Sequence, residues 1–125
     1  MWQKLLLIAL AGSLGTLARY GTATLVQGLV GGDFPWGTMA ANMAGCFLAG
    51  LVWALAESKV NFDAHAKTVI LVGFMGAFTT FSAFMVDNGE LIRTGRSVWA
   101  VANILLQNGI GVALFFTGMS AGKMF

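Results

Sequence analysis

Charged residues are confined to short segments of this chain, and the long stretches between those segments are almost entirely apolar. There are four such stretches, and only the first contains a charge, at Arg19. A helix needs about 20 apolar residues to cross the hydrocarbon core of a bilayer. The pattern therefore predicts an all-α integral membrane protein, a single membrane domain over residues 1–125 with four transmembrane helices at about 4–29, 36–56, 67–87 and 97–122.

Three polar segments join the predicted helices. Residues 31–35 contain two glycines and the only proline of the chain, which is typical of a turn. Residues 57–67 hold five titratable side chains, and residues 87–96 hold four. We expect both of these segments to be solvated loops.

Composition excludes several other classes of protein. Lys and Arg number seven, Asp and Glu number five, and 58% of the residues are hydrophobic. A soluble domain is about 25% charged, so we exclude an ordinary soluble globule, a disordered chain and a nucleic-acid-binding tail. The single cysteine, Cys46, leaves no partner for an internal disulfide.

The predicted spans lack the residue combinations that catalysis needs. No pair of carboxylates falls inside a span, and no phosphate-binding glycine motif is present. The only histidine, His65, lies in a predicted loop. We therefore do not expect an enzyme.

The positive charges are nearly balanced across the membrane. Four spans place both ends of the chain on one side. The side with both ends then holds four lysines, Lys4, Lys59, Lys67 and Lys123, and the other side holds Arg93 and Arg96. Because cationic loops favour the cytoplasm, a weak bias permits insertion in either orientation. We therefore hypothesise dual topology in the plasma membrane.

Polar side chains inside the first two spans mark candidate functional positions. A charge at the centre of a span costs about 2.5–3.5 kcal/mol on insertion scales. Arg19 therefore either extends to the interface or faces a water-filled vestibule, where it would attract anions. Thr38 and Asn42 are four residues apart and share a helix face. The Asn42 amide either bonds a neighbouring helix or coordinates a ligand.

The centre of the third span is unusual for a continuous helix. Residues 73–84 contain two glycines, three hydroxyl side chains and four phenylalanines. We predict a helix break there, which a membrane tolerates only where protein or a cavity satisfies the backbone. Such a break exposes carbonyls that bind a cation and a helix N-terminus that favours an anion. Phe81 and Phe84 share a face, either as a packing pair or as the wall of a pore.

The fourth span carries a polar stripe. Asn103, Gln107 and Gly111 follow one another at four-residue spacing on an otherwise apolar helix. The stripe either lines a path or forms hydrogen bonds with the other helices.

Three motifs, in order along the chain, give it a resemblance to a known family. They are Gly12-x-x-Gly15-x-x-x-Arg19, Pro35-x-Gly37-Thr38-x-x-x-Asn42-x-x-Gly45 and Gly73-x-x-Gly76-Ala77-Phe78-Thr79-Thr80-Phe81-Ser82-x-Phe84. Over nearly its whole length the chain resembles the Fluc (CrcB-type) fluoride channels.

The resemblance implies an antiparallel, dual-topology homodimer in the bacterial inner membrane. Two separate pores would let fluoride leave the cytoplasm passively, which reduces fluoride toxicity. A structural sodium ion at the dimer interface would be held by the backbone carbonyls of Gly76 and Thr79 in both subunits. Arg19 matches a vestibule arginine of the family. The residues that match the pore, or stand beside it, are Phe81, Phe84, Asn42, Thr38, Thr80, Ser82 and Gln107.

The chain also departs from the family pattern. Gln107 stands where many members carry Tyr or His, and four other positions lack hydroxyls that are common in relatives, namely Ala83, Met85, Gly111 and Phe115. The hydroxyl track along the pore is therefore thinner. Some members work only as a pair of unlike subunits, so a heterodimer with a paralogous subunit is an alternative to the homodimer.

Two other functions fit parts of the pattern. A proton-coupled small multidrug exporter also has four helices, but its chemistry needs a carboxylate inside the membrane, and the first span has Arg19 instead. A non-transporting membrane subunit is the other alternative. The predicted break in the third span argues against it, because a break lowers stability and would have no function in such a subunit.

Overall fold

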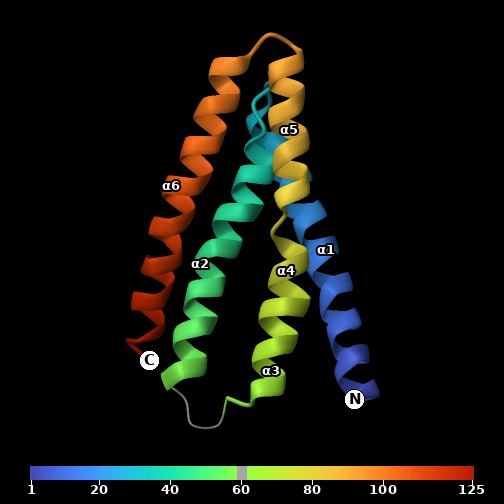
Figure 1. The fold of residues 1–125 in the computed structure, drawn as a ribbon, viewed down its shortest axis with the longest axis vertical. Helices are drawn as coiled ribbons and strands as arrows, with labels where there is room; N and C mark the ends of the chain where they lie inside the picture. The colour runs from blue at the N-terminus through green and yellow to red at the C-terminus, as the bar shows by residue number, and fades with distance from the viewer. Residues whose placement is uncertain (59–61) are drawn as a thin grey trace.

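Four long helical segments run up and down side by side in the computed structural model, which describes residues 1–58 and 62–125. Both termini lie at the same end of the bundle (Figure 1). The first, second and last spans are single helices: α1 (Trp2–Val30), α2 (Trp36–Ser58) and α6 (Ser97–Gly122). The third span consists of α3 (Ala64–Thr68), the π-helical segment η1 (Val69–Met75), α4 (Gly76–Phe78) and α5 (Phe81–Arg93).

All four segments are long and apolar enough to cross a membrane, which confirms the predicted all-α class and the number of spans. Large apolar side chains are exposed along them; Leu14, Leu105 and Phe116 are each at least half exposed. Such surfaces suit contact with lipid, because lipid tails do not penalise apolar exposure.

The third span is longer than the sequence analysis predicted. It begins at Ala64, where the Asp63 side chain caps it by accepting from the His65 N–H, and it ends only at Arg93. Residues 64–66 and 88–93 were expected in loops. They are helical because polar residues beyond the apolar core still satisfy their backbone within the helix, and Arg93 also pairs with Glu90 one turn earlier, at 2.8 Å.

Close contact between α2 and α6 depends on small residues. A Cβ added at Gly50 would collide with the Phe115 carbonyl oxygen, and one added at Gly118 would collide with the Phe47 carbonyl oxygen. Small residues permit this approach in lipid, where packing drives helix association. Gly50 and Gly118 therefore serve packing within one chain.

The end of the bundle away from the termini is tied together by two loops. Asp33, between α1 and α2, pairs with Arg96, between α5 and α6, at 2.8 Å. The Phe34 ring lies 4.5 Å from the Trp36 ring and 6.2 Å from the Trp99 ring, measured between centroids. These contacts fix the start of α2 against the start of α6.

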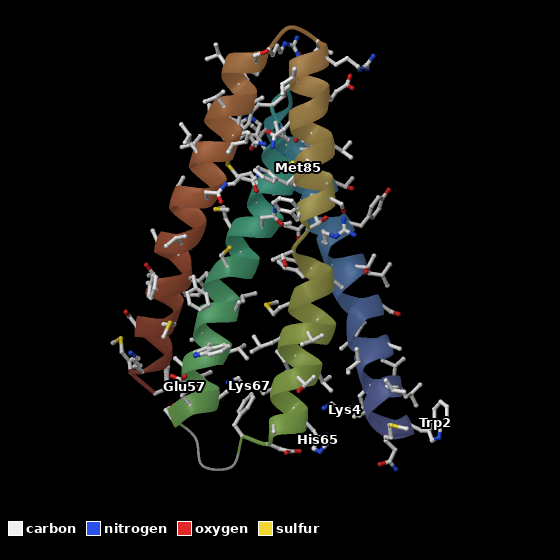
Figure 2. All side chains as sticks on the ribbon, viewed as in Figure 1. Trp2, Lys4, Glu57, His65, Lys67 and Met85 are labelled. Atoms are coloured by element: carbon white, nitrogen blue, oxygen red, sulfur yellow. The ribbon has the colours of Figure 1, made fainter. Side chains whose placement is uncertain are left out.

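The end that holds the termini carries most of the remaining charges. Figure 2 shows Lys4, Glu57, His65 and Lys67 at this end, and Met85 in the other half of the molecule. Lys67 lies 4.0 Å from the centre of the Trp53 ring. Lys59, one of the four lysines expected on this side, lies outside the described residues.

Candidate functional site

The third span bends close to its middle. Helix α4 ends at Phe78, Thr79 and Thr80 have extended backbone with ψ of 153° and 124°, and α5 begins at Phe81. Figure 1 shows the thin connection between α4 and α5 at this level. Extended backbone at membrane depth needs hydrogen-bond partners from elsewhere in the protein.

Asn42 supplies those partners from α2. The Thr80 N–H donates to Oδ1 of Asn42 at 2.8 Å, and Nδ2 of Asn42 donates to the Thr80 carbonyl at 3.2 Å. In a continuous helix the Thr80 N–H would bond the Gly76 carbonyl. The Asn42 side chain thus takes the place of the Gly76 carbonyl as the acceptor for the Thr80 N–H. The Gly76 carbonyl is left without that donor.

Hydroxyl groups finish the two helix ends at the bend. The Thr79 N–H and Oγ1 both donate to the Met75 carbonyl, at 3.0 and 2.8 Å. The Thr80 Oγ1 accepts from the Ala83 N–H at 3.2 Å and so caps α5; it also lies 3.2 Å from Oγ of Ser82. The Thr79 hydroxyl therefore serves the helix that ends at the bend, and the Thr80 hydroxyl serves the helix that begins there.

Arg19 reaches the same region from α1. Its Nε donates to the Ala77 carbonyl at 3.1 Å, and its side chain is half-buried. A cation is favourable there because the carbonyl end of a helix carries partial negative charge. Sequence analysis did not foresee this contact, and a role for Arg19 in a vestibule stays a prediction.

The polar stripe on α6 continues the hydrogen bonds of Asn42 into the bundle. Nδ2 of Asn42 donates to Gln107 at 2.9 Å, Gln107 donates to Asn103 at 3.0 Å, and Asn103 donates to Asn88 at 2.8 Å. We call Asn42, Gln107, Asn103 and Asn88 the amide chain. Gln107 and Asn103 therefore form hydrogen bonds with α2 and α5, and a role of the stripe in lining a path stays a prediction.

Asn88 was missed because it fell in a segment that was expected to be a loop. Its signal in the sequence is its position four residues after Phe84, which places both on one helix face. Asn88 and Phe84 are indeed both buried, at 3% and 5% exposed.

Phe81 and Phe84 are neighbours in different surroundings. Their ring centroids are 5.8 Å apart, but Phe84 is 5% exposed whereas Phe81 is 73% exposed. Both line an open groove of about 520 Å³ between α2, α6 and the third span. The groove brings together most of the predicted site residues, namely Asn42, Gly76, Thr79, Thr80, Phe81, Phe84 and Gln107.

Thr38 lies apart from this groove. It lines a second hollow near the loop end, beside the Asp87 carboxylate of α5. Oδ2 of Asp87 is buried and lacks a hydrogen-bond partner among the described residues. Thr38 and Asn42 lie one turn apart on the same face of α2, but Thr38 lines this second hollow and Asn42 lines the groove.

No side-chain metal site is present within 1–58 and 62–125, where no three His, Cys, Asp or Glu residues could hold a metal ion. Backbone carbonyls are the remaining oxygen ligands. The Gly76 residue is exposed and Thr79 is half-buried, and both line the groove.

Four apolar spans, each long enough to cross a bilayer, define a multi-pass integral membrane protein. The family model described as "CrcB-like protein, Camphor Resistance (CrcB)" matches residues 6–119. The chain belongs to this family.

Relatives are similar over almost their whole length. The protein named fluoride-specific ion channel FluC from Desulforapulum autotrophicum is 46% identical over 124 residues, which cover 99% of both chains. Proteins of the same name from Nitrosococcus oceani and Solidesulfovibrio magneticus are 44% and 46% identical, with the same coverage.

Proposed function

We propose that this chain is the subunit of a fluoride-selective channel that lets fluoride leave the cell passively across the bacterial inner membrane. The observation that carries the proposal is the near-complete match to three relatives named fluoride-specific ion channels. The bend at Thr79 and Thr80 supports it, since a polar interruption inside an apolar span suits an ion path.

The charges and dipoles at the bend suit an anion. Helix α5 begins at Phe81, so its positive end lies near the middle of the third span. Arg19 adds a formal positive charge close to the same level. A membrane potential that is negative inside drives an anion outward with about 2.3 kcal/mol per charge per 100 mV, so export needs no other energy source.

Fluoride is strongly hydrated, and its water shell must be replaced inside the protein. Exposing a bare ion to a low-dielectric medium would cost tens of kcal/mol. The candidate replacements are the positive edges of the Phe81 and Phe84 rings, the amide of Asn42 and the hydroxyls of Thr38, Thr80 and Ser82. A narrow pore with these groups selects by size and donor geometry.

The functional unit in this proposal is an antiparallel homodimer with dual topology. Phe81 is 73% exposed on one chain, although a pore-lining ring needs a wall opposite it. A second copy packed over the groove would supply that wall. A paralogous subunit would do so in the heterodimer alternative.

The bend also supports a sodium ion at the centre of such a dimer. The Gly76 carbonyl is deprived of its helical donor by Asn42, and Gly76 is exposed. Free carbonyl oxygens suit a hard cation. Two copies that cross at this level would bring the Gly76 and Thr79 carbonyls of both chains around one ion.

Anion efflux from liposomes that contain the purified protein tests the proposal. We expect fluoride to be released while chloride is retained, with no requirement for a proton gradient. Retention of fluoride by liposomes with this protein, alone and with any paralogous subunit, would refute a fluoride channel. Efflux that depends on a proton gradient would favour the exporter class.

A further inference from the structure

The hydrogen bonds of the amide chain all run in one direction, and one backbone group sets that direction. The Thr80 N–H can only donate, so the Asn42 atom that faces it must be Oδ1. Nδ2 of Asn42 is then left for Gln107, which must present Oε1. The same step repeats at Asn103 and at Asn88, so the orientation of every amide follows from the bend.

The far end of the amide chain holds an unused donor. Asn88 accepts at Oδ1, and its Nδ2 is buried without a partner among the described residues. A buried donor without a partner destabilises the folded state, because it has lost its hydrogen bond to water and gained none in the protein. Reversing the chain would let Nδ2 of Asn88 donate to Asn103, but it would place a donor of Asn42 against the Thr80 N–H. The orientation of the Asn42 amide is therefore fixed by the Thr80 N–H, and the unsatisfied donor lies at Asn88.

Both hydrogens of the Asn42 amide are already donated, one to the Thr80 carbonyl and one to Oε1 of Gln107. An anion in the groove can reach an Asn42 N–H only if one of these acceptors moves. The Thr80 carbonyl belongs to the backbone, whereas within the described residues the other end of the Gln107 amide is held by Asn103 alone. Asn103 thus holds Gln107 with its oxygen toward Asn42, and this hydrogen bond keeps an Asn42 N–H directed along the groove that both residues line.

We propose that Asn103 is a positioning residue for anion passage, which acts through Gln107 to fix the amide of Asn42 at the groove. The inference rests on the proposed fluoride conduction. Asn103 is 0% exposed and does not line the groove, so it does not touch the ion itself.

A double-mutant cycle in liposomes tests whether Asn103 acts through Gln107. We expect Asn103→Leu to lower fluoride efflux about tenfold, the effect of about one hydrogen bond, and to cause no further loss in a Gln107→Leu background. Thr117→Val is the control on the same helix, because that hydroxyl bonds its own helix at the Ala113 carbonyl on an exposed face and does not line the groove; its efflux should not change. Unchanged efflux in Asn103→Leu, or the same loss in both backgrounds, would overturn the proposal.

Side-chain amide NMR of the full chain in detergent micelles provides a readout without fluoride. We expect Asn103→Leu to shift the Asn42 amide resonances, and Thr117→Val to leave them in place. An unshifted Asn42 amide would overturn the inference even if the wild type conducts. Conversely, wild-type protein that does not conduct fluoride would refute the proposed channel. The NMR experiment would still test whether Asn103 fixes the Asn42 amide.

A milder variant covers the case in which Asn103→Leu does not assemble. Asn88→Leu removes only the last acceptor of the amide chain. We expect it to shift the Gln107 amide resonance, and the Asn42 resonance by less. Resonances that stay in place in Asn88→Leu would contradict the coupling along the chain.

Discussion

Phe81 and Phe84 are adjacent side chains, yet one chain buries only the second. Exposure is 73% for Phe81 and 5% for Phe84. A change at Phe84 therefore leaves a cavity within the subunit, whereas a change at Phe81 alters a surface that one chain leaves open.

We expect Phe81→Ile to reduce fluoride efflux strongly with little effect on folding, because the ring edge is lost and no core contact is removed. Phe84→Ile should reduce efflux and also lower the free energy of unfolding, by about 0.5–3 kcal/mol. Liposome efflux and thermal unfolding in detergent measure the two effects. Phe116→Ile, a change to a ring that is 59% exposed on α6, is the control. Normal efflux in Phe81→Ile would show that this ring does not line the pore.

Arg19 is a second residue with two separable effects. Its Nε bonds the Ala77 carbonyl, and its charge acts over a longer range. We expect Arg19→Ala to lower fluoride efflux more at low salt than at high salt, since salt screens the charge. Arg19→Lys should retain the part of the fluoride efflux that depends on salt, because lysine keeps the positive charge. Equal losses for Arg19→Ala at both salt concentrations would assign the residue to the helix end alone.

At the scale of helices, the contact between α2 and α6 offers a test with a matched pair of glycines on one helix. A Cβ at Gly118 would meet the Phe47 carbonyl oxygen, whereas a Cβ at Gly109 has nothing within 4 Å. We expect Gly118→Ala to lower the free energy of unfolding by about 1–3 kcal/mol, because backbone must shift. Gly109→Ala should be neutral or slightly stabilising, since alanine favours helix by up to about 1 kcal/mol. Equal unfolding midpoints for the two variants would contradict the close packing.

At the scale of the whole molecule, one chain leaves its groove, Phe81 and Gly76 open, and we propose that a second copy and a sodium ion complete it. We expect replacement of sodium by N-methylglucamine at constant ionic strength to weaken the dimer and to lower fluoride efflux. Exchange of dye-labelled subunits in detergent measures dimer stability. Subunit exchange that is equally slow in both salts would argue against a structural sodium ion.

The sequence alone determined the class of protein and the number of spans. A charge in hydrocarbon is costly, so the long stretches that carry no charge, or Arg19 alone, had to be the membrane helices. It also indicated where the third span bends, because residues 76–82 combine glycine with hydroxyl side chains that favour helix ends. The ends of that span differ from the prediction, because the helix extends through polar residues from Ala64 to Arg93.

Only the tertiary structure decided which groups meet at the bend. Helical spacing places Asn42 on a face, but it does not say that the amide replaces the helical partner of the Thr80 N–H. Nor does spacing join Asn103 to Asn88, which lie on different helices, or direct Arg19 to the Ala77 carbonyl. Periodicity fixes the direction of a side chain from its own helix axis, whereas its partner depends on how the helices pack against one another.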